Sequence, residues 1–189
     1  MNEEVRKDIL NVIEGVIEAY NRYNPEDIME LSNHIIHSAS IYQERYTSMV
    51  AIIVYSIGKI MAKGKITRYP QEAWNLFDYT VKNGLKCLIN ALRNKDLKSF
   101  DKCIIKLQKA VMTLDESFMN YADYVIDHAR LKKGSKVYEH GVSIKRVSEL
   151  FGISEWELMN YTGKMRILER DEEKSEVPER LRKARRLLE

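Results

Sequence analysis

The chain has 189 residues, of which 44% are hydrophobic and 31% are charged, and its formal net charge is +3. This composition supplies a sizeable core and a well-solvated surface, so it excludes an intrinsically disordered protein. The mild positive charge is compatible with a nucleic-acid partner but does not require one, because charge must be concentrated on one face to drive such binding. Only eight glycines and three prolines are present, as long helices require.

Several features bear on the compartment in which the chain works. The N-terminus has no apolar stretch of the kind found in signal peptides. The most apolar run, 49–62, contains a lysine and is too short to span a bilayer, so no membrane partner is expected. Two cysteines, Cys87 and Cys103, are too few for a disulfide scaffold, and we expect buried thiols in a reducing cytoplasm. Scarce glutamine beside abundant Lys, Glu, Ile and Tyr favours an archaeal or thermophilic source.

The first half of the chain predicts three helices. Apolar residues at helical spacing predict the first helix over 3–23. Asn24 and Pro25 then supply a cap and a first-turn proline, which predicts the start of a second helix. A third helix is expected over about 47–62. Because it is apolar nearly all round, it should lie at the centre of a bundle. A loop is expected after it.

Two further helices are predicted before residue 132. One begins near Pro70, and a long one begins near Asp96. The long helix carries a heptad-like apolar seam that suits either packing inside the bundle or pairing in a homodimer. The seam consists of Leu107, Val111, Leu114, Phe118, Tyr121 and Val125. Because no strand pattern competes, the fold class is all-α, with an antiparallel helical bundle over 1–132.

The pattern changes after Lys132, Lys133 and Gly134, where shorter helices follow. We expect a small helix-turn-helix module over 133–168 and a charged C-terminal helix or tail over 169–189.

The stretch GVSIKRVSELFGISEWELMNYTGK (141–164) carries the main functional signal. Gly141 suits the end of one helix, and Ser143 can cap a helix that ends at Gly152. Ser154 and Glu157 have the spacing of a capping box, which starts another helix. Two short helices joined by a three-residue turn predict helix-turn-helix geometry.

This stretch resembles the DNA-binding helix-turn-helix of bacterial repressors. Within it, VSELFGISEWELMNY is also similar to the corresponding motif of small prokaryotic antitoxins, including the tryptophan. The resemblance covers about 25 of the 189 residues. It implies DNA contacts through the second short helix and flanking cations, at Lys145, Arg146, Glu155, Trp156, Asn160, Lys164 and Arg166.

These side chains have unequal chemistry for a duplex. Asn160 can bond adenine in the major groove, and the cations can contact phosphates. Glu155 opposes phosphate but can accept from a cytosine amine, and Trp156 can instead pack onto the body. The basic tail residues Arg180, Arg182, Lys183, Arg185 and Arg186 could add phosphate affinity, or could form a solvated terminal helix.

Other constellations are weaker. Glu30, His34 and His37 fall on one helix face at a spacing that could present three ligands to a metal, with no fourth ligand identified. Small toxin nucleases carry an Arg shortly before a His, whereas Arg130 and His140 lie ten residues apart here. Phosphate-loop, dinucleotide and hydrolase motifs are lacking. We therefore expect no enzyme activity and no cofactor.

The sequence thus predicts a cytoplasmic regulatory protein that binds double-stranded DNA, either a transcription regulator or antitoxin-like. The alternative is a non-enzymatic module whose helix-turn-helix binds a partner protein.

Overall fold

The computed structural model describes residues 1–66, 71–112 and 116–165, without the side chains of 64–66, 110, 112 and 116–125. Its helices are α1 (Glu3–Asn21), α2 (Pro25–Tyr42), α3 (Arg45–Ile66), α4 (Gln71–Arg93), α5 (Leu97–Met112), α6 (Glu116–Glu139) and α7 (Ile144–Phe151). A further helix covers 155–165. The described ranges contain no strand, which confirms the all-α prediction.

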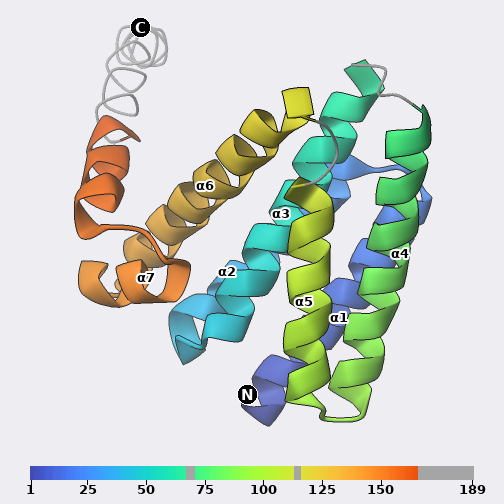
Figure 1. Ribbon diagram of the computed structural model, residues 1–189. Helices are drawn as coiled ribbons and strands as arrows, with labels where there is room; N and C mark the ends of the chain where they lie inside the picture. The colour runs from blue at the N-terminus through green and yellow to red at the C-terminus, as the bar shows by residue number, and fades with distance from the viewer. Residues whose placement is uncertain (67–70, 113–115, 166–189) are drawn as a thin grey trace, which may run out of the picture.

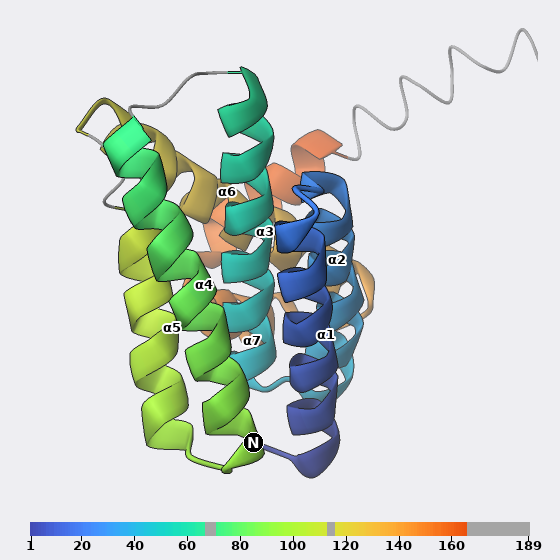
Figure 2. The same ribbon diagram turned by 90° about the vertical axis from the view of Figure 1, so that its right-hand side faces the viewer.

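Helix α3 lies at the centre of the bundle, as its all-round apolar pattern predicts (Figures 1 and 2). The unbroken stretch Val50–Gly58 is buried, and α3 contacts α1, α2, α5, α6 and α7. The helix continues past its predicted end to Ile66. No helix in the described ranges combines the length and apolarity needed to cross a membrane.

The helix α2 begins where the sequence predicts. The Asn24 side chain accepts a hydrogen bond from the Asp27 backbone N–H at 3.3 Å, and Pro25 occupies the first turn. A backbone N–H at this first helical position would have no intrahelical partner. Proline, which lacks an N–H, therefore fits there without losing a hydrogen bond. The helix ends at Gln43, which has a left-handed φ of 49°. The carbonyl of this capping residue accepts a hydrogen bond from Arg146 of α7.

The predicted long fifth helix is wrong. Helix α5 ends at Met112 and α6 begins at Glu116, and the two run in opposite directions (Figure 1). Leu107 and Val111 of the predicted seam are buried in α5, while Leu114 lies outside the described residues. Both α5 and α6 contact α3, and the side chains of Phe118, Tyr121 and Val125 lie outside the described residues. The seam, which was expected either to pack inside the bundle or to pair two copies, is therefore not carried by one continuous helix.

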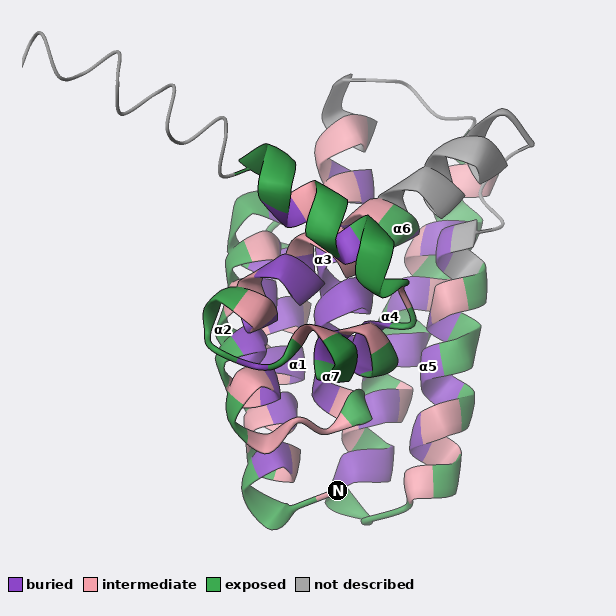
Figure 3. Ribbon diagram, turned by 90° about the vertical axis from the view of Figure 1, so that its left-hand side faces the viewer, coloured by how far each residue is buried: buried purple, intermediate pink, exposed green. Residues whose placement is uncertain are grey.

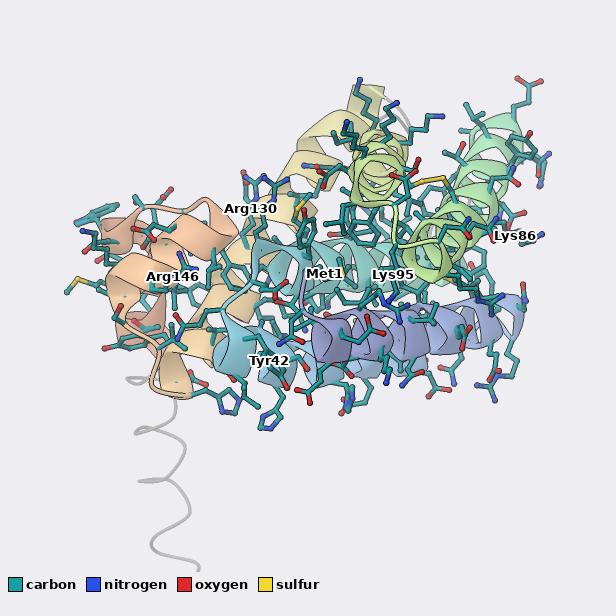
Figure 4. All side chains as sticks on the ribbon, turned by 90° about the horizontal axis from the view of Figure 1, so that it is seen from below. Met1, Tyr42, Lys86, Lys95, Arg130 and Arg146 are labelled. Atoms are coloured by element: carbon teal, nitrogen blue, oxygen red, sulfur yellow. A yellow bond between two sulfur atoms is a disulfide. The ribbon has the colours of Figure 1, made fainter. Side chains whose placement is uncertain are left out.

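The expectation of two free thiols is also wrong. Cys87 of α4 and Cys103 of α5 form a disulfide, with their Cα atoms 5.9 Å apart (Figure 4). The short connection between α4 and α5 makes these helices antiparallel neighbours, so a separation of 16 residues brings the two side chains together. A reducing compartment therefore cannot be inferred from the cysteines.

Candidate nucleic-acid interface

Local capping shapes the C-terminal helices. Gly141 has a φ of 90° after the end of α6, a conformation that glycine adopts without strain. The Ser143 side chain accepts from the Arg146 N–H and caps α7. Gly152 ends α7 at a φ of 63°. The Ser154 hydroxyl then accepts from the Glu157 N–H at 3.1 Å, while the Glu157 carboxylate accepts from the Ser154 N–H at 3.0 Å. This reciprocal pair starts the helix over 155–165.

The C-terminal part of α6 supports these short helices. A Cβ atom at Gly134 would lie 3.1 Å from Ile153 Cδ1 and 3.3 Å from Val147 Cγ1. The absence of a side chain there lets α7 and the turn lie directly on α6. Val147, Leu150 and Phe151 are buried in this contact region. The position of the module therefore depends on the backbone of α6.

The outer side of the helix at 155–165 is open to solvent (Figure 3). Leu158 and Thr162 are buried on its inner side. Four predicted contact residues on this helix are exposed: Glu155, Trp156, Asn160 and Lys164. The alternative in which Trp156 packs onto the body is wrong, because 72% of its surface is exposed. The structure brings these four side chains onto one projecting helix.

Arg146 links α7 to the end of α2 through its guanidinium group. Its Nη2 donates to the carbonyl of Gln43 at 2.8 Å and its Nη1 donates to Glu149 at 3.1 Å. The first bond places a positive charge at the C-terminus of α2, where the helix dipole favours it. Arg146 thus ties α7 to the bundle (Figure 4).

The remaining charges nearly balance. Lys145 and Lys164 are exposed cations, and Glu149, Glu155 and Glu157 are exposed acids. The hydrogen bonds from Ser154 lower the pKa of the Glu157 carboxyl group, so this residue stays ionised. Arg166 and the predicted tail cations Arg180, Arg182, Lys183, Arg185 and Arg186 lie outside the described residues. Within the described residues, α7 and the helix at 155–165 therefore carry no concentrated positive face.

The sequence reasoning missed Met159, which is 60% exposed and lies one helical turn after Trp156. The residue before it, Leu158, is buried on the inner side of the same helix, so helical spacing was the signal that could have found Met159. Trp156 and Met159 together form an apolar strip on the outer side of this helix.

A buried lysine under the module was also missed. Lys133 of α6 is fully buried, and its Nζ donates to Asn33 Oδ1 of α2 at 2.7 Å. The same nitrogen lies 4.5 Å from the centroid of the Tyr55 ring of α3. Burial, together with the neighbouring charges of Lys136 and Lys132, lowers the pKa of Lys133 to about 7. This contact joins α6, and hence the module, to α2 and α3.

The metal-ligand candidates do not converge. The Glu30 carboxylate accepts from the Asn33 amide at 3.0 Å, and His34 Nε2 lies 3.4 Å from Asp8 Oδ1. His37 instead meets the ring of His140, with centroids 5.7 Å apart. Across the described residues, no group of three His, Cys, Asp or Glu side chains could hold a metal ion.

No protein-family model, curated protein or solved structure matches this chain. The candidate site is therefore defined by its own geometry.

Proposed function

We propose that this protein is a DNA-binding regulatory protein, a transcription regulator or antitoxin-like, that inserts the helix at 155–165 into the major groove. The observation that carries the proposal is the exposure of this helix: only its inner side packs, and Asn160 faces solvent. The major groove of B-DNA is about 12 Å wide and admits one helix. A cytoplasmic location follows from this function.

The exposed side chains would divide the work of recognition. Asn160 supplies a donor and an acceptor that match the edge of adenine. Trp156 offers apolar contact to a thymine methyl group, and Glu155 can accept from a cytosine amine. Lys145 and Lys164 would contact phosphates on either side. Arg146 would act indirectly, by holding α7 against the bundle through Gln43.

The charge balance predicts how binding depends on salt. Lys145 and Lys164 form no ion pair within the described residues, so each copy of the module offers about two cations to phosphate. The logarithm of the binding constant should then fall with the logarithm of salt concentration with a slope of about −2 per copy. A steeper slope would indicate that the basic tail also contacts the backbone.

Fluorescence anisotropy with a labelled duplex of mixed sequence tests this proposal. The full chain is titrated at several salt concentrations beside the double variant Lys145→Gln/Lys164→Gln. We expect weak binding by the native protein and a slope closer to zero for the variant. Lys86→Gln/Lys95→Gln removes two exposed lysines elsewhere on the chain and should leave the slope unchanged. Absence of binding at low salt would contradict the proposal.

A second candidate function is recognition of a partner protein by the same helix. It is favoured by Trp156 and Met159, two large apolar side chains that are 72% and 60% exposed. Apolar anchors one turn apart suit a helix that lies in a groove of another protein. Flat anisotropy titrations with DNA would favour this second function over the first.

A further inference from the structure

A cavity of about 310 Å³ lies where the bundle meets α7. Its walls come from four helices: α3, α5, α6 and α7. The lining residues are Arg45, Met49, Ile52, Ile53, Ile104, Gln108, Arg130, Glu149, Leu150, Phe151 and Gly152. The volume falls at the lower end of the usual range for small-molecule sites, about 300–1,000 Å³.

The cavity has an apolar floor and a polar rim. Ile53, Ile104 and Phe151 are at most 4% exposed, so they form its inner surface. Arg45 is exposed and Arg130 is half-buried, which places their guanidinium groups nearer the opening. Figure 4 shows Arg130 on the side where α6 faces the module. An occupant should therefore have an apolar body and one polar end.

The two rim arginines retain donors for such an occupant. Arg45 Nη2 lies 3.5 Å from Asp101 Oδ1, and Arg130 Nη1 lies 3.4 Å from Asp127 Oδ1. These are single, long contacts, whereas a guanidinium group carries five N–H donors. Within the described residues neither arginine has a closer acidic partner. Both arginines line the same cavity, so a carboxylate at its rim can accept charge-assisted hydrogen bonds from the remaining donors of these arginines.

The acid in the lining does not cancel this preference. Glu149 is paired with Arg146 at 3.1 Å, and Arg146 also donates to the carbonyl of Gln43. The lining then holds two cations against one acid whose charge is already balanced. Asp101 and Asp127, which pair with the two arginines, lie outside the lining, so the polar groups at the rim that suit a carboxylate are the remaining N–H donors of Arg45 and Arg130.

We propose that this cavity binds a small amphipathic monocarboxylate, with its carboxylate at Arg45 and Arg130 and its chain or ring against Ile53, Ile104 and Phe151. The cavity wall formed by 149–152 leads directly into the turn before the helix at 155–165. An occupant therefore restrains the segment that orients this helix. This regulatory step rests on the proposed DNA-binding function, whereas ligand binding itself does not.

Calorimetric titration of the full chain with octanoate, beside 1-octanol and octylammonium, tests the ligand class. We expect octanoate to bind at least tenfold more tightly than the alcohol or the amine. Arg130→Gln and Arg45→Gln should each weaken octanoate binding by about tenfold. The matched control is Arg93→Gln, because Arg93 is as exposed as Arg45 and is likewise paired with a carboxylate, that of Glu14; it should bind octanoate as the native protein does.

A variant whose side chain fills the cavity gives a second test. Gln108 lies partly exposed at the lining, so Gln108→Trp can occupy the space without removing a core side chain. Native far-UV circular dichroism together with lost octanoate binding would support the site. Equal binding of octanoate and 1-octanol, undiminished binding by Gln108→Trp, or no octanoate binding by the native protein would overturn the proposal.

The regulatory step needs a separate readout. Anisotropy with duplex DNA is compared with and without saturating octanoate, and we expect at least a threefold change in affinity. Octanoate binding without DNA binding would refute the proposed function and leave the ligand site standing. Binding of both without any mutual effect would refute the coupling alone.

Discussion

Replacing the buried Lys133 by methionine should change how the stability of the protein depends on pH. Lys133 is fully enclosed between α6, α2 and α3, and its pKa falls from 10.5 to about 7 through burial first and the charges of Lys136 and Lys132 second. In the unfolded chain the lysine regains its ordinary pKa. Between pH 7 and about 10.5 the unfolded state therefore binds more protons than the folded state, and the free energy of unfolding rises with pH.

The size of the effect follows from the shift. One pKa unit corresponds to about 1.4 kcal/mol. Between pH 7 and pH 9, where the unfolded lysine stays charged, the native protein should gain about 2 kcal/mol of stability relative to Lys133→Met. The variant retains the volume of the side chain and lacks the titrating group, so other groups that titrate in this range contribute to both proteins alike.

Urea denaturation at pH 7, 8 and 9, followed by far-UV circular dichroism, measures this difference. Lys136→Met is the matched control, because Lys136 also donates to Asn33 Oδ1, at 3.1 Å, and its removal leaves Lys133 in place. The control should keep a rise with pH of the same sign as the native protein. Parallel pH profiles for the native protein and Lys133→Met would refute the burial of a titrating lysine at this position.

Three more predictions concern the frame that holds the site. Reduction of the Cys87–Cys103 bond, which closes a loop of 16 residues, should lower the free energy of unfolding by about 3 kcal/mol; identical urea midpoints with and without reductant would contradict the bond. Ser154→Ala removes the cap of the helix at 155–165 and should cost about 1 kcal/mol in urea denaturation, while Ser154→Thr, which keeps a hydroxyl that can accept from the Glu157 N–H and donate to the Glu157 carboxylate, should cost much less. Gly134→Leu places a side chain where Ile153 and Val147 pack; amide exchange should accelerate in 144–165 and stay slow in α1, and unchanged protection of 144–165 would count against this packing.

Much of the fold follows from local signals in the sequence. Asn24 and Pro25 mark the start of α2, and Ser143 and Gly152 bound α7, because caps and positive φ angles are properties of single residues. The central position of α3 follows from its uniform apolar character. These features need no knowledge of which helices are neighbours.

The features that depend on tertiary neighbours were not predictable. The apolar spacing runs on from α5 into α6, so the sequence gives no periodicity break where the chain reverses. The disulfide depends on α4 and α5 being side by side. Lys133 follows another lysine in the sequence, a pattern typical of exposed residues. It is nevertheless buried, because α2 and α3 cover it. The cavity draws residues from helices far apart in the chain.

The candidate site was predictable in part. The resemblance to helix-turn-helix motifs implied that Asn160 faces outward and left Trp156 between two positions, and both residues are exposed. The hydrogen bond from Arg146 to the Gln43 carbonyl was not predicted, because the two residues are 103 positions apart.

The most direct test of the central claim is selection of duplexes from a randomised pool by the full chain, beside Asn160→Ala. Direct readout by the helix at 155–165 predicts an enriched motif that contains an adenine, with preference for that base lost in the variant and the rest of the motif kept. No enriched motif for the native protein, or the same motif with full adenine preference for Asn160→Ala, would contradict recognition of DNA by this helix.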